Sequence, residues 1–444
     1  MIDSLEILIK EKKYSLLKNE LINMNEADIA EVLENLDEAD LITVFRLLPK
    51  DLAALVFSYL SIENEQIIIK ALSDKEAGLI IDSMYADDAA DLIDEMPSNV
   101  VKRLLSNTTK ETRRDINNLL KYEDDSAGSI MTVEFIDLKE NYTIQEALDI
   151  IKMEANNIEN IDICYVLDHT RKLLGYVKLK DILINDNNVL IKDIMRKVHV
   201  KVKTSTDQEV VAHKFKKYDI NMIPVVDSEN KLVGVITIDD IVDIIDEETT
   251  EDIEKMAAIT PNDKPYNKTG VFQTYLKRIP WLLLLMISAT FTGKIIQSYE
   301  TALASYVVLT SFIPMLMDTG GNAGSQSSVT IIRSLSLNEI KFKEIFKVIF
   351  KEIRVAILVG ITLAVANFFK LLIIDQVSIT IALVVCLTLI LTVIVAKIVG
   401  STLPMIAKKL GFDPAVMASP FITTIVDAIS LVIYFTIATN LLHI

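Results

Sequence analysis

The stretch Pro314-Met-Leu-Met-Asp-Thr-Gly-Gly-Asn-Ala-Gly-Ser-Gln-Ser-Ser-Val329 is polar and rich in glycine, yet it lies inside an otherwise apolar segment, Leu303–Ile332. Backbone groups without hydrogen bonds are costly in lipid, so irregular polar backbone at membrane depth is expected only beside protein or water. Such an interrupted segment is typical of a transport path. The stretch therefore predicts a broken membrane segment in an ion conductor rather than in a membrane-anchored enzyme.

Five apolar stretches in the second half of the chain are long enough to cross a bilayer, which takes about 20 helical residues. Loops rich in Lys and Arg alternate with loops that are not, and basic loops face the cytoplasm. We therefore expect a multi-pass plasma-membrane protein with a cytoplasmic N-terminus and an extracellular C-terminus. The stretches lie near Ile279–Gln297, Leu303–Ile332, Val355–Ile374, Ile379–Leu403 and Pro420–Leu442.

Charge divides the chain into two parts. Residues 263–444 carry 9 acidic and 15 basic side chains, so 53 of the 62 acidic and 30 of the 45 basic residues lie in residues 1–262. An acidic soluble region attracts cations and repels nucleic acid and anionic lipid. We expect divalent cations and membrane lipid as partners, and no nucleic acid. The alternative is that the acidic surface only keeps this half soluble.

Residues 25–120 repeat with a period of 12. One short helix cannot bury its own apolar face, so we expect the blocks to stack into an all-α superhelix. An isolated four-helix bundle is the alternative. Pro49 and Pro97 begin two of the blocks, as expected for the first turn of a helix. The eighth position of every block is apolar: Val32, Val44, Val56, Ile68, Ile80, Leu92, Leu104 and Ile116.

A second, longer repeat mixes strands with helices. In each copy, alternating apolar runs around a turn are followed by a helical run, which predicts a strand–turn–strand–helix unit. The matching segments are Ile130-Met131 with Ile194-Met195, the residues around Gly175 with those around Gly234, and Asp181 with Asp240.

The two copies resemble a tandem pair of CBS domains. The resemblance implies that the pair binds ATP or another adenine nucleotide, or reports a ligand to an attached module. It also implies that Lys180 and Asp181 hold the nucleotide ribose. The alternative role for Asp181 is to cap a helix.

Two acidic runs are candidates for a cation sensor. Asp87 and Asp91 are four residues apart, as are Asp239 and Asp243, so each pair shares a helix face and its members repel each other. A hard divalent cation with oxygen ligands would relieve that repulsion. The alternative is a solvated acidic face. The candidate ligands are Asp87, Asp88, Asp91, Asp240, Asp243, Glu248, Glu251 and Asp252.

Asp427 lies in the apolar segment Phe421–Tyr434, which contains no basic residue. Charged residues inside a membrane are rare, costly and usually functional. The alternative is a structural aspartate that is hydrogen-bonded between helices. We expect Lys397, near the end of its own span, to extend its ammonium group towards the inner face of the membrane.

Two motifs resemble the signatures of the MgtE family of magnesium channels: Pro314-x-x-x-Asp318-x-Gly-Gly-Asn-Ala-Gly-x-Gln326 and Gly411-x-Asp-Pro-Ala-x-x-x-x-Pro420-x-x-Thr-Thr-x-x-Asp427. The resemblance covers essentially the whole chain. It implies a homodimer whose pore follows the two-fold axis, where Asp427 faces its counterpart. It also implies closure when cytoplasmic magnesium binds acidic sites between the N domain, the CBS domains and the connecting helix.

The expected fold is multi-domain, with an all-α superhelical N domain, tandem α/β CBS domains, a long connecting helix and a five-helix polytopic α membrane domain. The boundaries are residues 1–125 for the N domain, 126–192 and 193–245 for the CBS domains, 246–275 for the connecting helix and 276–444 for the membrane domain.

Magnesium gives up its hydration water reluctantly, so its filter should offer oxygen ligands to a hydrated ion. We expect the glycines at 320, 321 and 324 to let the backbone approach the pore axis. The candidate pore ligands are Asp427, Ala428, Thr423, Thr424 and Asn322.

Taken together with the resemblance, these observations predict a magnesium-selective channel that admits divalent cations, and the resemblance implies Mg²⁺ as both substrate and regulator. The alternative is a secondary divalent-cation exchanger coupled to sodium or protons, although Asp427 alone offers little for a second coupling ion. An anion channel would need basic groups along the pore. An enzyme is not expected, because the four histidines show no metal-ligand spacing and no nucleophile–base motif appears. The lack of a Walker A loop predicts downhill passage of the ion.

Overall fold

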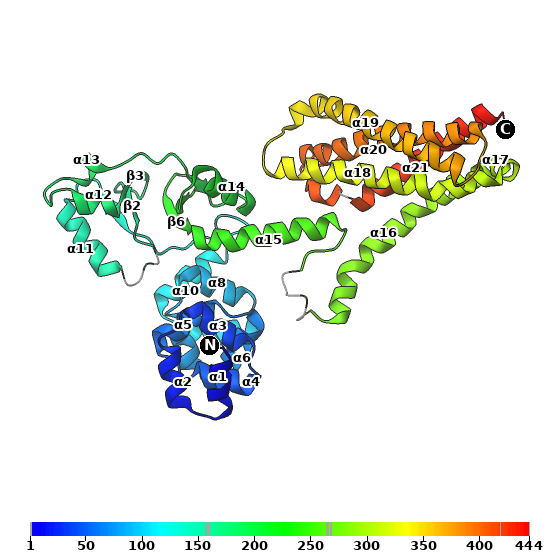
Figure 1. Cartoon of the computed structure of the whole chain (residues 1–444). Helices are drawn as coiled ribbons and strands as arrows, with labels where there is room; N and C mark the ends of the chain where they lie inside the picture. The colour runs from blue at the N-terminus through cyan, green and yellow to red at the C-terminus, as the bar shows by residue number, and fades with distance from the viewer. Residues whose placement is uncertain are drawn as a thin grey trace. The chain divides into compact units, whose positions relative to one another are not determined.

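The computed structural model describes residues 2–155, 158, 160–262, 266, 269–417 and 419–443 of the 444-residue chain (Figure 1). The chain forms two compact units, Met1–Ile245 and Asp246–Ile444. The first unit holds the short helices and both sheets, and the second holds the long apolar helices.

The 12-residue repeat forms one short helix per block. The first residue of each block is the N-cap, and the side chains of Asn25, Asp37, Ser73 and Thr109 accept a hydrogen bond from the backbone of the first turn. The eighth residue of every block is buried. The helices are α1 (Ile2–Lys10), α2 (Tyr14–Leu21), α3 (Glu26–Glu34), α4 (Glu38–Phe45), α5 (Lys50–Ser58), α6 (Ile62–Ala71), α7 (Asp74–Ile81), α8 (Ala86–Asp94), α9 (Ser98–Asn107) and α10 (Lys110–Leu119).

These helices stack in an alternating order. α3 packs on α5, α5 on α7 and α7 on α9, while α4 packs on α6 and α8 on α10. Five helices, α3, α4, α5, α7 and α8, thus pack against the helix two places further along the chain. This is the stacked arrangement that the repeat predicts, rather than an isolated four-helix bundle.

Two three-stranded sheets follow in the same unit. In both, the first strand pairs parallel with the second, and the second pairs antiparallel with the third. The first α/β unit contains β1 (Asp137–Lys139), α11 (Ile144–Glu154), β2 (Ile163–Leu167), β3 (Leu173–Lys178), α12 (Leu179–Ile184) and α13 (Ile191–Ile194). The second contains β4 (Val202–Lys203), α14 (Gln208–Tyr218), β5 (Met222–Val226), β6 (Leu232–Thr237) and the start of α15 (Ile238–Met256).

Each α/β unit receives a segment from the other. Thr132 pairs with Val235 of β6, and Arg196 pairs with Tyr176 of β3. A Cβ on Gly234 would lie 2.6 Å from the sulfur of Met131, and one on Gly175 would overlap Met195. The matching glycines therefore make room for the matching methionines of the opposite copy.

The connecting helix is shorter than predicted. It is the second part of α15, and it ends at Met256, where Ala258 adopts a left-handed conformation (φ 54°) and Pro261 follows. The predicted helix over 246–275 is therefore not continuous. Residues 263–265, 267 and 268 of that range lie outside the described residues.

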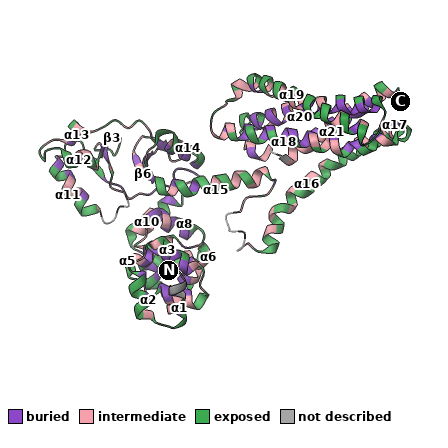
Figure 2. Ribbon diagram, viewed as in Figure 1, coloured by how far each residue is buried: buried purple, intermediate pink, exposed green. Residues whose placement is uncertain are grey.

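Within its described residues, the second unit contains four helices long and apolar enough to cross a membrane: Val271–Ser298, Phe342–Ile373, Ile379–Lys409 and Pro414–Leu442. Their helical cores are α16 (Val271–Ser298), α19 (Ile345–Ile373), α20 (Ile379–Lys409) and α21 (Ser419–Leu442), and η2 (Phe342–Glu344) and η3 (Pro414–Met417) precede α19 and α21. Figure 2 shows that α16 is mostly exposed, whereas α20 buries many of its residues.

The remaining predicted span, Leu303–Ile332, is second in chain order and does not form one spanning helix. It consists of the end of α17 (Glu300–Ser305), η1 (Val307–Phe312) and most of α18 (Ile313–Ser336). The polar stretch 314–329 is not a break, because it lies entirely within α18, where helical hydrogen bonds satisfy the backbone. The irregular part comes earlier, at η1, where the Tyr434 hydroxyl donates a hydrogen bond of 2.9 Å to the Leu309 carbonyl.

Candidate ion path and acidic regulatory site

Helix α18 has two faces of different character, one polar and exposed and one lined by buried glycines. Asp318, Asn322 and Gln326 are spaced one helical turn apart and are exposed on one side. Gly320, Gly321 and Gly324 are buried against α20 and α21. A Cβ on Gly321 would lie 2.9 Å from Thr423 of α21, so these glycines serve close helix packing. Asp318, Asn322 and Gln326, in contrast, keep their side chains exposed.

Helix α21 carries the other predicted pore residues. Asp427 and Ala428 are partly exposed, and the charge of Asp318 acts on Asp427, which brings the acidic groups of the two motifs into one region. The hydroxyls of Thr423 and Thr424 both donate hydrogen bonds of 2.9 Å to the Pro420 carbonyl. Their oxygens keep acceptor capacity for a hydrated cation.

Lys397 does not extend to the membrane surface, so that expectation was wrong. Its side chain is buried, and its ammonium group donates a hydrogen bond of 3.1 Å to the hydroxyl of Ser327. Glu352 of α19 lies 3.8 Å away. The nearby carboxylate offsets part of the desolvation cost of burying the ammonium group. The sequence alone did not indicate this partner.

The first unit brings several predicted sensor carboxylates together. Burial and the charges of Asp240, Asp239 and Glu134 raise the pKa of Asp88 to about 6. Burial and the charge of Asp239 raise the pKa of Asp240 to about 6, although Thr237 donates a 2.6 Å hydrogen bond to its carboxylate. Acidic side chains at the start of α8 therefore lie close to acidic side chains at the start of α15.

Asp87 is the most deeply buried member of this acidic cluster, which we define as Asp87, Asp88, Glu134, Asp239 and Asp240. Burial and the charges of Asp88, Asp240 and Glu134 raise its pKa well above the usual value. Glu134 accepts hydrogen bonds from Thr132 and from the backbone of Ala86. It belongs to the first α/β unit, and no sequence pattern had indicated its place in the cluster.

Glu65 was also missed by the sequence analysis. It is 6% exposed, and burial with the charges of Asp88, Asp91 and Glu34 raises its pKa to about 8. A signal was present, because Glu65 occupies the fifth position of its block. Most other blocks have an apolar residue there: Ile29, Leu41, Ala53, Ala77, Ala89 and Val101.

The remaining candidates are not members of the acidic cluster as defined above. Asp91 and Asp243 are exposed in the first unit, and Asp243 acts electrostatically on Asp240. Glu248, Glu251 and Asp252 belong to the part of α15 in the second unit. Among the described residues, no three His, Cys, Asp or Glu side chains converge as a preformed metal site. The acidic cluster is thus a group of closely spaced carboxyl groups rather than a complete coordination sphere.

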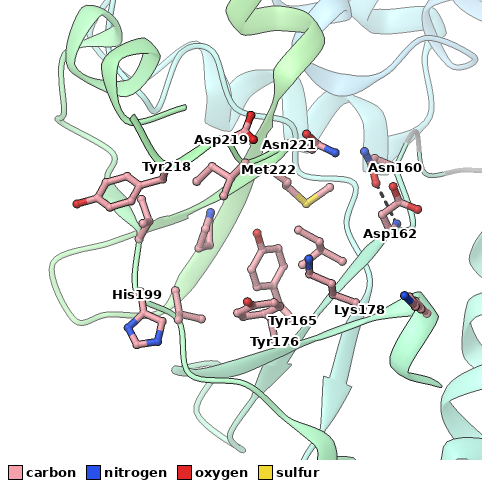
Figure 3. A pocket seen from close by; sticks show the side chains of 16 residues that line it. Asn160, Asp162, Tyr165, Tyr176, Lys178, His199, Tyr218, Asp219, Asn221 and Met222 are labelled. Carbon is pink, nitrogen blue, oxygen red and sulfur yellow. Dashed lines mark hydrogen bonds between the residues drawn. The ribbon is translucent and has the colours of Figure 1, made fainter. Parts of the chain in front are cut away.

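A pocket of about 500 Å³ is lined by both α/β units. Figure 3 shows Tyr165, Tyr176 and Lys178 of the first α/β unit lining the pocket. His199 and Tyr218 of the second α/β unit also line it. Aromatic rings beside a lysine suit a flat, negatively charged ligand. Lys180, a predicted nucleotide residue, lines this pocket too.

Asp181, the other predicted nucleotide residue, does not line the pocket. Its carboxylate forms an ion pair of 2.8 Å with Arg196, and its side chain is 15% exposed. Its side chain also does not cap α12, whose N-cap is Lys178. The pair joins the first α/β unit to the segment that leads into the second.

Family comparisons match successive parts of the chain. Residues 24–125 match the MgtE intracellular N domain, residues 127–186 and 191–247 match CBS domains, and residues 313–437 match the divalent cation transporter domain of MgtE. These matches cover the stacked helices, both α/β units and the helices α18 to α21.

Whole-chain comparisons agree with them. The chain is 33% identical over 348 residues to the magnesium transporter MgtE of Thermus thermophilus, covering 77% of this chain and 76% of that protein. It is 34% identical over 330 residues to the corresponding protein of Enterococcus faecalis, covering 74% and 72%. A match to inosine-5'-monophosphate dehydrogenase of Methanocaldococcus jannaschii covers only 26% of this chain, in the CBS region.

Solved structures resemble the first half. The cytosolic domain of the Mg²⁺ channel MgtE in complex with ATP is 33% identical, with a TM-score of 0.52, and covers 55% of this chain and 100% of that chain. The soluble part of a magnesium transporter is 30% identical, with a TM-score of 0.52, and covers 56% and 97%.

Proposed function

This chain belongs to the MgtE family of divalent cation transporters, and we propose that it is a magnesium-selective channel. In this proposal it admits divalent cations across the plasma membrane, and it closes when cytoplasmic magnesium binds to its acidic region. The relatives that it matches over most of its length are magnesium transporters, not enzymes. Mg²⁺ is then both the substrate and the regulator.

The gating part rests on one observation, the acidic cluster. Asp87, Asp88 and Asp240 are buried or partly buried beside one another, and burial and like charges raise the pKa of all three carboxyl groups. A divalent cation would neutralise this repulsion and draw α8, Glu134 and the start of α15 together. Because the second part of α15 belongs to the second unit, where Met256 packs with Ile332 of α18, such compaction would act on the channel.

The path part rests on α18 and α21. The stripe of Asp318, Asn322 and Gln326 is exposed on a helix of the membrane unit, and polar groups on such a helix need a polar neighbour or water. A second copy of the chain would supply that neighbour. We place the path at the two-fold axis of a homodimer, where Asp427, Ala428, Thr423, Thr424 and Asn322 offer oxygen atoms to a hydrated ion.

The pocket between the α/β units is the proposed nucleotide site. The related cytosolic domain was solved in complex with ATP. In this chain Tyr165 and Tyr176 would contact an adenine ring, and Lys178 and Lys180 would attract the phosphates. Asp181 would act indirectly, through its ion pair with Arg196.

The membrane orientation follows from the distribution of charge. The loop between α18 and α19 and the end of α20 are basic, which favours their cytoplasmic placement together with the acidic unit. The C-terminus after α21 would then lie outside.

Uptake measurements on purified protein in liposomes test this proposal. We expect Mg²⁺ uptake without any sodium or proton gradient, and we expect uptake to slow as magnesium rises on the cytoplasmic side. Uptake that occurs only with a sodium or proton gradient would replace the channel by a secondary exchanger. Uptake that is independent of cytoplasmic magnesium would contradict the proposal that cytoplasmic magnesium closes the channel.

A further inference from the structure

We infer that Lys397, Ser327 and Glu352 form a buried charged network that positions helix α18 for ion transport. The three residues come from three helices of the membrane unit: Ser327 from α18, Glu352 from α19 and Lys397 from α20. The inference deepens the proposed function and rests on it, because α18 carries the polar stripe assigned to the ion path.

The contacts form a continuous chain. The Lys397 ammonium group donates to the Ser327 hydroxyl at 3.1 Å, and that hydroxyl donates to Glu352 Oε2 at 2.6 Å. The ammonium nitrogen lies 3.8 Å from the same carboxylate oxygen. The Ser327 hydroxyl thus accepts a hydrogen bond from the ammonium group and donates one to the carboxylate, so its orientation is fixed.

All three groups are removed from solvent. Lys397 is 5% exposed, Ser327 is 2% exposed and the side chain of Glu352 is 12% exposed. A buried pair is only weak evidence for overall stability, because two charges must be desolvated. Removing one partner, however, leaves an uncompensated buried charge, which is strongly unfavourable. The network therefore fixes one arrangement of the three helices more than it stabilises the fold.

The position of Ser327 explains why α18 is the element that is held. Ser327 follows Gln326, the last member of the polar stripe, and Ser328 donates a 3.4 Å hydrogen bond to the Met417 carbonyl before α21. Glycines on the same helix pack directly on α20 and α21. Glycine packing sets the distance between these helices, whereas the charged network sets the axial position and rotation of α18. A shift of α18 would move Asp318 and Asn322 relative to Asp427.

Four variants of the full-length protein test the network: Lys397→Met, Glu352→Gln, the double variant with both changes, and the charge exchange Lys397→Glu with Glu352→Lys. Lys370→Met is the matched control, because Lys370 pairs with Asp375 at 2.6 Å but is 45% exposed. Two quantities are measured for each protein: the initial Mg²⁺ uptake rate in liposomes as a function of Mg²⁺ concentration, and the unfolding temperature in detergent.

Each single variant is expected to lower the maximum uptake rate by about tenfold or more, because one charge stays buried without its partner. It is also expected to raise the Mg²⁺ concentration at half-maximal rate, which a loss of folded protein alone would not do. The double variant or the charge exchange should regain most of the rate. Lys370→Met should change neither quantity.

Single variants with the rate and half-saturation of the wild type would overturn the inference. The inference would also be overturned if the losses of uptake rate in the two single variants multiplied in the double variant and the charge exchange restored no rate. The two residues would then act independently. The unfolding temperatures of the single and double variants also show whether the two residues interact, and this comparison does not depend on which ion is carried. If the wild type carried no Mg²⁺, the proposed function would fail, and the unfolding data would still decide whether the pair exists.

Discussion

Lys255 Nζ lies 2.8 Å from Asp413 Oδ2, and this ion pair joins the end of helix α15 to the turn before helix α21. The same ammonium group also contacts Glu251 of α15. Next to it, Met256 packs with Ile332 of α18 and Ala415 of η3. Burial alone would lower the pKa of Lys255, but the hydrogen bonds to Asp413 and Glu251 outweigh it and raise the pKa. The end of the connecting helix is therefore fixed to both helices assigned to the ion path.

Lys255→Met is expected to weaken the response to cytoplasmic magnesium. A partly exposed pair contributes roughly 0.2–1 kcal/mol, so the internal Mg²⁺ concentration that halves uptake should rise by about 1.4- to fivefold. The matched control is Lys231→Met, which removes an ion pair with Glu229 in the turn of the second α/β unit. An unchanged response in Lys255→Met would show that the contact does not transmit the signal.

Asp88→Asn and Asp240→Asn are expected to weaken the same response more strongly. Each change removes one carboxylate from the acidic cluster and with it part of the attraction for a divalent cation. The internal Mg²⁺ concentration for half closure should rise roughly tenfold or more, within the usual range of coupling between sites. Asp28→Asn on the exposed face of α3 is the control. Closure at the wild-type concentration would exclude these carboxylates as sensors.

Stability without divalent cations should increase as the pH falls. Asp88 and Asp240 have a pKa of about 6 in the folded protein against an ordinary value of 3.8, so the folded state binds more protons between these values. Their stabilising contribution is complete below the ordinary value and is lost as the pH rises through about 6. The unfolding temperature in EDTA should thus be higher at pH 5.5 than at pH 7.5.

Added Mg²⁺ should raise the unfolding temperature more at pH 7.5 than at pH 5.5, because protonated carboxyl groups bind metal poorly. The double variant Asp88→Asn with Asp240→Asn should lose most of this difference. An equal effect of Mg²⁺ at both pH values would place its binding site elsewhere.

Gly400→Ala should impair transport and stability together. A Cβ at this position would overlap the Gly324 carbonyl of α18, so α18 and α20 would have to separate. Overpacking of this kind costs about 1–3 kcal/mol. Gly293→Ala in α16 is the control, because within the described part of the chain no atom outside its own helix lies within 4 Å of a Cβ at that site. Thermal unfolding and uptake of Gly400→Ala at the level of the control would contradict this account of the close packing.

The sequence predicted the elements whose signals are periodic. The 12-residue repeat predicted the stacked helices, since the same position is buried in every block. The longer repeat predicted both strand pairs, because alternating apolar residues flank each turn. Four of the five apolar stretches are helices of spanning length.

Features that depend on partners distant in sequence were not predicted. The polar stretch at 314–329 resembles a break in sequence, but its glycines are explained by the neighbouring helices α20 and α21. Lys397 resembles a residue at the membrane surface until Glu352 and Ser327 are placed beside it. The exchange of Met131 and Met195 between the α/β units also needs the folded structure, although Glu65 could have been found from its place in the repeat.

The most direct test of the proposed ion path is Mg²⁺ uptake by Asp427→Ala, with cytoplasmic magnesium kept low so that the channel is open. Asp375→Ala is the control, because Asp375 is an acidic residue in the loop between α19 and α20 and pairs with Lys370. The account predicts that Asp427→Ala folds normally but loses selective Mg²⁺ uptake, whereas Asp375→Ala keeps it. Uptake by Asp427→Ala with the rate and selectivity of the wild type would contradict the placement of the path along α18 and α21.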